Sequence, residues 1–491
     1  MGDVILKDNK NIKKLRRTES FKRLINLGLS AICLGLEVGM FAYMWIFHFQ
    51  NSVVEGLRNF WFKGHLLEIA IYGVMLFLLS VMYGGMRLGY LKNVEIIFSQ
   101  IFATILANIF IYGELSVMAF QLFMPKLFIY MTIVQIIIVI VWISIANLIY
   151  KNVFPPRKLA VIHNGRSSIN LNEKFELRKD KYKVVENIPY SMDTAEICEK
   201  ISRDYENGVY NAVVLGDMPV AKRNILFKYC YEKMIRVYLL PKISDVILTG
   251  AEELHVFDTP LLLTREYKLS MEERFIKRMI DIVFSLILLI VASPFMLLTA
   301  LAIKLYDRGP ILYKQVRCTE GRREFMILKF RSMRTDAEKD GVARLASKTD
   351  DRITPVGKFI RKCRLDELPQ LINILKGDMS FIGPRPERPE IIAQYVEVMP
   401  EFVYRMNVKA GLAGFAQVYG KYNTTPYDKL KLDLTYIENY SVMMDLKLML
   451  LTLKILFWPD STEGVETEQL TALREVNEAR KKEYGEDDIE D

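Results

Sequence analysis

The hydrophobic positions of this chain fall into long uninterrupted runs in its first 150 residues and into shorter periodic segments afterwards. Four long runs occur, at about 25–47, 66–86, 94–115 and 127–150. Each is close to the roughly 20 apolar residues that an α-helix needs to cross the hydrocarbon core of a membrane. We therefore predict a membrane protein with four N-terminal transmembrane helices within residues 1–155.

Charge around these runs predicts their orientation. The cations that precede the first run are Lys7, Lys10, Lys13, Lys14, Arg16, Arg17, Lys22 and Arg23. The segment after the fourth run is basic again, at Lys151, Arg157 and Lys158. Because cytoplasmic flanks carry the excess of positive charge, we expect both ends of this region to lie in the cytoplasm. The polar, basic start of the sequence predicts no cleavable signal peptide.

From 156 to 265 the pattern changes to short apolar strands that alternate with helices. The predicted strands are KLAVIHNG, YKVVENI, NAVVLG and IRVYLL, and the predicted helices cover 191–207 and 219–234. Such alternation predicts a small Rossmann-like α/β module with a parallel sheet. Its first turn, HNGRSS, has one glycine where a dinucleotide fingerprint needs three, so we expect a structural or regulatory module.

A fifth apolar run, at 282–303, has basic sequence on both flanks. A straight crossing would place the rest of the chain outside, whereas the flanking charge favours the cytoplasm at both ends. Pro294 lacks the N–H that would bond one turn back, and the hydroxyl of Ser293 can satisfy a freed backbone group. We predict a re-entrant membrane helix over 276–305, with its break at Ser293 and Pro294. The alternative is a fifth crossing with a proline kink.

Residues 354–377 combine a helix start at Thr354-Pro355 with apolar residues at helical spacing and cations between them. This predicts a basic amphipathic helix that lies in the lipid interface or packs on protein. A further helix is predicted from Asp366 to Lys376. Asp366 would then lie at a helix N-terminus, where the helix dipole favours an ionised, nucleophilic carboxylate. Glu367 beside it would help to hold a divalent cation that bridges diphosphate oxygens.

Two basic elements frame this acidic pair. The strand-like LKFRSM presents Lys329 and Arg331, and the proline-rich loop GDMSFIGPRPERP presents Arg385 and Arg388. Rigid arginine forks suit phosphate groups, so cations around an acidic pair predict phosphoryl transfer. By themselves, Asp366 and Glu367 are better explained as a helix-capping aspartate beside a solvated glutamate, and the surrounding basic elements shift the interpretation toward chemistry.

Composition narrows the choice of function. The net charge of +8 fits anionic partners such as lipid headgroups and nucleotides. The four histidines, at 48, 65, 163 and 255, all precede the predicted catalytic segment, which argues against a phosphohistidine intermediate or a Ser-His-Asp hydrolase. The five cysteines show no CxxC spacing and are expected to be reduced. Cys363 is expected to pack as part of the apolar stripe, and residues 462–491 are expected to form a solvated acidic tail.

From about 272 to 460 the sequence resembles the bacterial sugar transferases, the long-form monotopic polyprenyl-phosphate hexose-1-phosphate transferases. The motifs that carry the resemblance are GPILYKQVR, LKFRSM, DDRITPVGKFIRKCRLDELPQL, GDMSFIGPRPERP and VKAGLAGFAQV. The last motif departs from the family, whose members often have proline after the lysine and threonine before the last glycine. The sugar therefore stays open. The resemblance implies a mostly helical catalytic domain at 266–461.

The resemblance implies transfer of a sugar-1-phosphate from a UDP-sugar to polyprenyl (undecaprenyl) phosphate, with Mg²⁺ as cofactor and release of UMP. Asp366 matches the nucleophile that forms an aspartyl-phosphosugar, and Glu367 matches the neighbouring acid linked to the metal. Arg385 matches the phosphate-binding arginine. Lys329 lies in the matching basic motif, and Ser293-Pro294 match the break of the re-entrant helix. Arg331 and Arg388 are further phosphate-binding candidates.

The family works at the cytoplasmic face of the inner membrane, in exopolysaccharide, capsule or O-antigen synthesis. The expected partners are a UDP-sugar, polyprenyl phosphate, membrane lipids and a second copy in a homo-oligomeric dimer, with no nucleic acid. Two alternatives belong to other classes. A lipid-acceptor glycosyltransferase would release UDP and usually needs an Asp-x-Asp motif, and a non-enzymatic membrane scaffold would leave the acidic pair idle.

Overall fold

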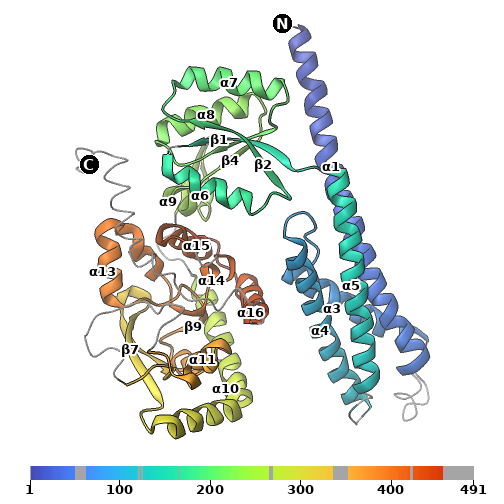
Figure 1. The fold of residues 1–491 in the computed structure, drawn as a ribbon, viewed down its shortest axis with the longest axis vertical. Coiled ribbons are helices and arrows are strands. Elements are labelled where there is room, and N and C mark those ends of the chain that lie inside the picture. Colours follow the sequence, from blue (N-terminus) through green and yellow to red (C-terminus); the bar gives the residue numbers. More distant parts are fainter. Residues whose placement is uncertain are drawn as a thin grey trace. The chain divides into compact units, whose positions relative to one another are not determined.

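The computed structural model describes residues 2–49, 62–119, 122, 125–163, 165–264, 269–335, 352–420 and 424–456. The chain folds into two compact units, Met1–Leu240 and Pro241–Asp491 (Figure 1). The predicted acidic tail at 462–491 lies outside the described residues.

Each of the four apolar runs in the N-terminal unit forms a helix, as predicted. The helices are α1 (Gly2–Met44), α3 (Phe62–Tyr83), α4 (Asn93–Met118) and α5 (Pro125–Val153), and a short π-helix at Trp45–Phe49 continues α1. Together with one helix of the C-terminal unit, they are the five helices of the described chain with the length and apolar composition to cross a membrane. The sequence and the structure thus agree on a mostly helical membrane protein.

Polar side chains occur where these helices meet. Glu37 of α1 is fully buried, and its carboxylate accepts hydrogen bonds from Gln100 Nε2 at 2.7 Å and from the Thr104 hydroxyl at 2.5 Å. On α5, Gln135 donates to the backbone carbonyl of Glu37 at 3.0 Å. Polar groups at membrane depth need protein partners because lipid offers none, so this network helps to determine how the helices pack.

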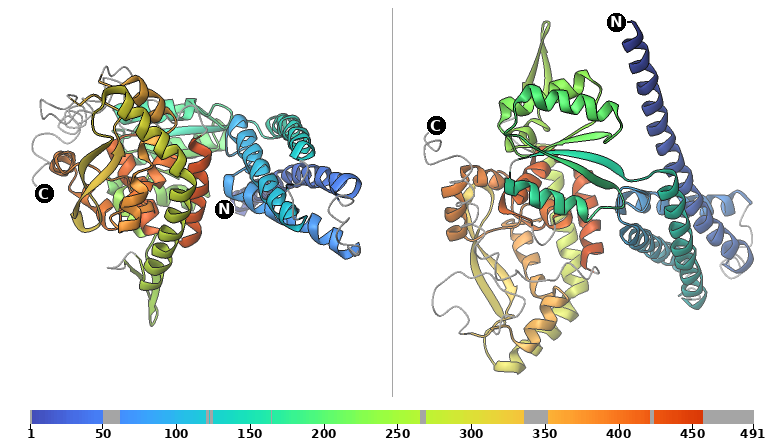
Figure 2. Two further views of the ribbon diagram at one scale, coloured as in Figure 1. Left: turned by 90° about the horizontal axis from the view of Figure 1, so that it is seen from below. Right: turned by 45° about the horizontal axis from the view of Figure 1, so that its top comes forward.

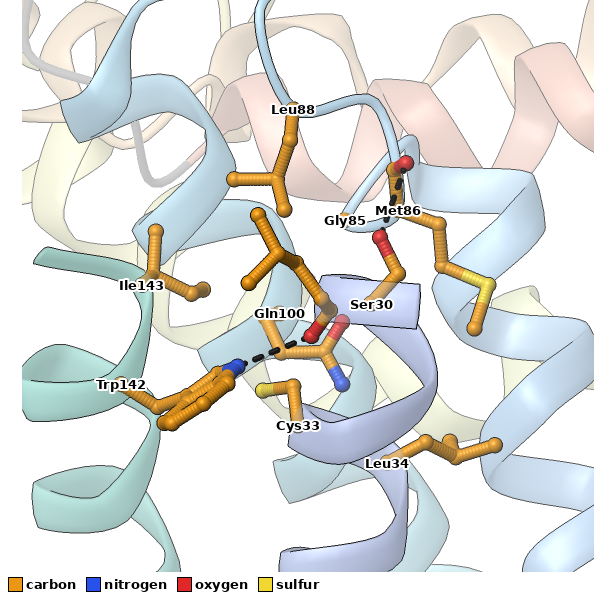
Figure 3. A pocket seen from close by; sticks show the side chains of 10 residues that line it. Ser30, Cys33, Leu34, Gly85, Met86, Leu88, Gln100, Trp142 and Ile143 are labelled. Carbon is orange, nitrogen blue, oxygen red and sulfur yellow. Dashed lines mark hydrogen bonds between the residues drawn. The ribbon is translucent and has the colours of Figure 1, made fainter. Parts of the chain in front are cut away.

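A small pocket lies beside this network, between α1, α4, α5 and the turn after α3 (Figure 3). On one side of it, Trp142 donates its indole N–H to the carbonyl of Leu29 at 2.9 Å. On another side, Ser30 donates to the carbonyl of Met86 at 3.3 Å. Both bonds tie α1 to its neighbours.

The remainder of the N-terminal unit is a four-stranded parallel sheet with the strand order β2-β1-β3-β4, which confirms the predicted α/β module. Its strands are β1 (Arg157–His163), β2 (Tyr182–Pro189), β3 (Ala212–Leu215) and β4 (Val237–Leu239). The two predicted helices are α7 (Thr194–Glu206) and α8 (Val220–Glu232). Helix α6 (Gly165–Glu176) was not predicted, because its sequence GRSSINLNEKFE holds few apolar positions.

The main apolar core of the C-terminal unit includes Leu371, Phe381 and Leu434, and a smaller cluster contains Ile303, Phe330 and Ile360. Strands β7 and β8 pair in antiparallel fashion, and β9 pairs with β10 in parallel fashion. Its elements before residue 336 are α9 (Ile243–Leu248), β5 (Glu252–Val256), β6 (Thr259–Leu263), α10 (Met271–Asp307), β7 (Leu312–Cys318), the 3-10 turn Glu320–Arg322 and β8 (Glu324–Phe330). The later elements are α11 (Pro355–Lys362), the 3-10 turn Leu365–Glu367, α12 (Gln370–Lys376), β9 (Ser380–Ile382), α13 (Pro389–Val398), the 3-10 segment Pro400–Met406, β10 (Gly411–Ala413), α14 (Phe415–Tyr419), α15 (Pro426–Glu438) and α16 (Val442–Leu456).

Helix α10 contains the fifth apolar run and is continuous over 37 residues, with Pro294 inside it. Ser293 donates its hydroxyl to the carbonyl of Ile290 at 2.8 Å. That is the carbonyl that Pro294 leaves unbonded, so the predicted compensation by Ser293 is confirmed. Figures 1 and 2 show that the helix bends along its length. A bent helix fits both the re-entrant and the crossing alternative, and the re-entrant topology stays a prediction.

Candidate active site

Asp366 and Glu367 lie on the 3-10 turn Leu365–Glu367, between α11 and α12. The predicted helix start at Asp366 is wrong, since α12 begins at Gln370. Pro369 has no N–H to donate to the carbonyl one α-helical turn back, so the backbone before it uses the shorter 3-10 bonds. The acidic pair therefore lies ahead of the helix and not in its first turn.

Arg364 directs the chain into this turn. Its φ of 55° is in the left-handed region, where an L-residue with a side chain is uncommon. Such backbone strain persists only where the surrounding structure holds it, and it is found frequently at functional sites. The strained residue reverses the chain after α11 and aims the 3-10 turn at strand β8.

Packing ties the acidic segment to the membrane helix and to β8. Leu365 and Leu368, on either side of the pair, pack against a cluster that contains Ile303 of α10 and Phe330 of β8. Asn373 of α12, which is 2% exposed, completes the attachment. Its side chain donates to the carbonyl of Met326 at 2.9 Å and accepts from the N–H of Leu328 at 3.0 Å. The segment that carries the acids is thereby fixed to the strand that carries Lys329.

Of the predicted site residues, the structure brings together Lys329, Asp366, Glu367 and Arg385. Nη2 of Arg385 lies 2.6 Å from Oε1 of Glu367, and Nζ of Lys329 lies 3.5 Å from the same oxygen. Nη1 of Arg364 lies 3.9 Å from Oε2. Burial opposes ionisation of Glu367, but these three cations outweigh it and hold the pKa of its carboxyl well below the ordinary range. Glu367 is therefore a carboxylate at neutral pH.

Asp366 behaves differently from its neighbour. Burial and the charge of Glu367 raise the pKa of Asp366 to about 6, against the opposing effect of Lys329, Arg361 and Arg385. The predicted stabilisation of the ionised form by a helix N-terminus is wrong, because the residue precedes the helix. In its ionised form, a carboxylate with a raised pKa is a better nucleophile than an ordinary aspartate.

Arg331 and Arg388 occupy other places. Strand β8 ends at Phe330, so the alternation that predicted Lys329 and Arg331 on one face does not continue to Arg331. Arg331 is 7% exposed and forms an ion pair with Asp307 at the end of α10. Arg388 lies at the N-cap position of α13, at the far end of the loop that carries Arg385. Their assignment to phosphate binding stays a prediction.

Helix α11 shows how the predicted apolar stripe is used. Ile360 is buried in the cluster with Ile303, and Val356 packs against it. Phe359 is 62% exposed, and Cys363 is exposed as well. The expectation that Cys363 packs is wrong, since the helix ends at Lys362 and the chain turns there. One side of α11 thus packs on protein, while Phe359 and the cations remain available to a lipid surface.

Sequence reasoning missed a second set of charges beside Arg385. Glu387, two residues further along the loop, accepts a hydrogen bond from Lys429 at 2.6 Å and lies 3.5 Å from Nη1 of Arg317. Arg405 lies 2.8 Å from Asp433 and is almost fully buried. These residues are far apart along the chain, so spacing gave no signal for their contact. The one available hint was the unusual number of charges in segments of otherwise apolar character.

The donors beside Asp366 bear on whether this site can hold a divalent cation. Among the described residues, no group of three or more His, Cys, Asp or Glu gathers in one place. Mg²⁺ usually binds through one or two carboxylates and completes its shell with water and substrate phosphates. Asp366 and Glu367 are two adjacent carboxylates of that kind, and Nη1 of Arg364 lies 3.9 Å from Oε2 of Glu367, beyond hydrogen-bond distance.

Comparison with known proteins shows which family the region around Asp366 and Glu367 belongs to. Residues 272–459 match the model of the family described as bacterial sugar transferase. The exopolysaccharide production protein PSS of Rhizobium leguminosarum bv. phaseoli is 40% identical over 183 residues, which cover 35% of this chain and 91% of that protein. The chain belongs to the bacterial sugar transferase family. The matched region contains Lys329, Asp366, Glu367 and Arg385.

Longer relatives carry more specific names. The UDP-N-acetylgalactosamine-undecaprenyl-phosphate N-acetylgalactosaminephosphotransferase of Aeromonas hydrophila is 41% identical over 46% of this chain and 53% of its own length. The undecaprenyl-phosphate glucose phosphotransferase of Komagataeibacter xylinus is 40% identical over 61% of this chain and 58% of its own. The chain thus spans somewhat more than half the length of these relatives.

Proposed function

We propose that this sugar transferase moves a sugar-1-phosphate from a UDP-sugar to polyprenyl phosphate in two displacements. First, a carboxylate oxygen of Asp366 forms a bond to the β-phosphorus, and the bond from that phosphorus to the bridging oxygen breaks, so that UMP leaves. Next, a phosphate oxygen of the polyprenyl phosphate attacks the same phosphorus. The bond to Asp366 breaks, its carboxylate is restored, and the product is a polyprenyl diphospho-sugar.

The observation that carries this proposal is the position of Asp366 among cations. Lys329, Arg361 and Arg385 all act electrostatically on its carboxyl. Two of these cations, Lys329 and Arg385, form ion pairs with the neighbouring Glu367. Phosphoryl transfer is catalysed largely by positioning and by neutralising charge on the phosphoryl oxygens, which such a cluster provides. Bringing an anionic donor into the cluster also displaces water from around Asp366, which strengthens these interactions.

Mg²⁺ fits the same scheme as cofactor. Asp366 and Glu367 would hold it together with the diphosphate of the donor, and it would supply further positive charge toward the leaving UMP. Arg385 then interacts with two different anions, Glu367 and the phosphate of the donor. It neutralises Glu367 when no donor is bound, and it presents a planar fork to phosphate oxygens when the donor arrives.

The packing of the acidic segment on α10 supports a lipid acceptor. The segment with Asp366 packs on Ile303 in the last turns of α10, a helix whose apolar side chains are largely exposed. We propose that α10 enters the inner membrane from the cytoplasmic side, bends at Ser293-Pro294 and returns. This topology keeps both basic flanks in the cytoplasm and brings Asp366 to the level of the lipid phosphates.

The donor is proposed to be a UDP-hexose or UDP-N-acetylhexosamine, because the named relatives include glucose and N-acetylgalactosamine phosphotransferases. Such a product would begin the assembly of a surface polysaccharide. A screen of UDP-glucose, UDP-galactose and their N-acetylated forms would identify the sugar.

The decisive experiment identifies the nucleotide that is released. Membranes that contain the protein are incubated with the UDP-sugars, Mg²⁺ and polyprenyl phosphate, and the products are separated. We expect UMP and a lipid-linked diphospho-sugar. Release of UDP would instead establish a glycosyltransferase that moves the sugar alone, and release of neither nucleotide would favour a scaffold.

A further inference from the structure

The loop that carries Arg385 has every backbone carbonyl from Pro384 to Glu387 engaged in a hydrogen bond. The two outer carbonyls accept from backbone N–H groups. Gly411 donates to the carbonyl of Pro384 at 2.9 Å, and Cys318 donates to that of Glu387 at 3.1 Å. A loop rich in proline has few N–H groups with which to bond itself, so its shape depends on donors from elsewhere.

The two inner carbonyls accept from guanidinium groups. Nη2 of Arg405 donates to the carbonyl of Arg385 at 2.9 Å, and Nη1 of Arg317 donates to the carbonyl of Pro386 at 3.1 Å. Arg405 is 3% exposed. A guanidinium is costly to bury unless it is paired, so its use as a backbone donor at this depth requires carboxylates nearby.

Two carboxylates meet that requirement. Asp433 of α15 is 1% exposed and lies 2.8 Å from Nη2 of Arg405. Oε1 of Glu387 lies 3.6 Å from Nη1 of Arg405 and accepts from Lys429 of α15 at 2.6 Å. Arg405 thus joins helix α15 to the loop. It bonds the loop at Arg385, the residue whose side chain pairs with Glu367.

We propose that Arg405 is a positioning residue for the transfer of the sugar phosphate. It acts through Arg385, because its bond to the carbonyl of Arg385 determines where that residue's guanidinium lies relative to Asp366 and Glu367. This inference rests on the proposed function. Nη2 of Arg405 contacts both the carbonyl of Arg385 and Asp433, while Nη1 lies 3.6 Å from Glu387. The planar guanidinium therefore spans three acceptors with two nitrogens, and the single ammonium of a lysine reproduces the charge without that geometry.

The first test is the variant Arg405→Lys, assayed as the full-length protein in membranes by release of UMP. We expect kcat to fall by about 10- to 100-fold, since small displacements of a substrate-positioning group have effects of that size. The KM for the UDP-sugar should change much less. A residue that only stabilised the fold would lower the amount of active protein and the unfolding temperature, and active-site titration with labelled donor corrects kcat for that loss.

The sharper test is a double-mutant cycle with Arg385→Lys. If Arg405 acts through Arg385, the double variant should be about as active as Arg385→Lys alone, because the second change has nothing left to misplace. A matched control is Arg278→Lys. Arg278 also donates to two backbone carbonyls, those of Ile374 and Leu375, at 2.6 Å each, but away from this loop. Its fold-loss should multiply with that of Arg385→Lys.

The outcomes are distinct. Wild-type kcat in Arg405→Lys, or losses that multiply in the Arg405–Arg385 cycle, would overturn the inference while leaving the proposed function standing. A wild-type protein that releases no UMP would overturn both. If Arg405→Lys does not accumulate in membranes, Asp433→Asn serves in its place. It keeps the shape of the side chain and weakens its hold on Arg405, so a smaller loss of kcat that again fails to multiply with Arg385→Lys is expected.

Discussion

The guanidinium of Arg385 lies 2.6 Å from the carboxylate of Glu367, although α12 and β9 separate the two residues along the chain. This ion pair joins the proline-rich loop to the 3-10 turn that carries Asp366. Because Glu367 also contacts Lys329 at 3.5 Å, three separate segments converge on one carboxylate. The convergence places an ionisable Asp366 where an incoming phosphate would meet several cations.

Replacement of Asp366 by asparagine should abolish transfer. The amide has nearly the same shape but no negative charge with which to attack phosphorus, so neither UMP release nor a labelled protein should be detected after rapid quenching with radiolabelled donor. The matched control is Asp258→Asn, at the exposed tip of the β5–β6 hairpin, which should remain active. Full activity in Asp366→Asn would rule out the covalent route.

The two arginines of the GPRPER sequence should differ in importance. Arg385→Gln removes the cation closest to Glu367 and should lower kcat/KM on the order of 100-fold or more, as is typical when a group that stabilises transition-state charge is lost. Arg388→Gln, at the N-cap of α13, should cost much less. The check is kcat/KM for both variants with saturating polyprenyl phosphate, and equal losses would show that both arginines act on the substrate.

The stability of the C-terminal unit should depend on pH through Glu387. Burial opposes its ionisation, but Lys429, Arg405 and Arg317 lower the pKa of Glu387 to about 2. A carboxyl whose pKa is lower in the folded protein stabilises it above the pKa of the unfolded chain, and this contribution is lost as pH falls toward 2. The contribution at neutral pH is about 3 kcal/mol.

The variant Glu387→Gln tests that contribution. Its unfolding temperature in detergent should lie well below that of the wild type at pH 6, and the gap should narrow at pH 3, where the wild type loses its advantage. Glu390→Gln, at an exposed position nearby, should show no such narrowing. A gap that stayed the same at both pH values would mean that Glu387 contributes by packing and not by its charge.

The topology of α10 can be checked by chemical labelling. In a background without native cysteines, Glu272→Cys and Lys314→Cys place single thiols on exposed residues near the two ends of α10. If the helix is re-entrant, a membrane-impermeant thiol reagent should label both only after the cytoplasmic side is opened. Labelling of the thiol at position 314 in intact cells would establish a fifth crossing, and the catalytic residues would then face outward.

The elements that could be predicted from sequence are those determined by local physics. Long apolar runs predicted α1, α3, α4 and α5, and a proline with a preceding serine predicted the hydrogen bond between Ser293 and Ile290. Helix α6 was missed because its sequence holds few apolar positions, although Leu171 and Phe175 pack against the core of the sheet. The start of α12 was misplaced because a proline near a helix start is compatible with more than one boundary.

The sequence by itself determined that the chain enters a membrane, that it carries a parallel α/β module, and that its acids and cations are of the kinds used on phosphates. Hydropathy, charge and short motifs are properties of neighbouring residues, so they can be seen before folding. Only the tertiary structure decided that Glu367 neutralises Arg385, that Arg331 pairs with Asp307, and that Arg405 holds the loop from α15. Electrostatic interactions depend on the distance between charges in space. That distance is determined by which distant segments pack together and not by the spacing of the residues along the chain.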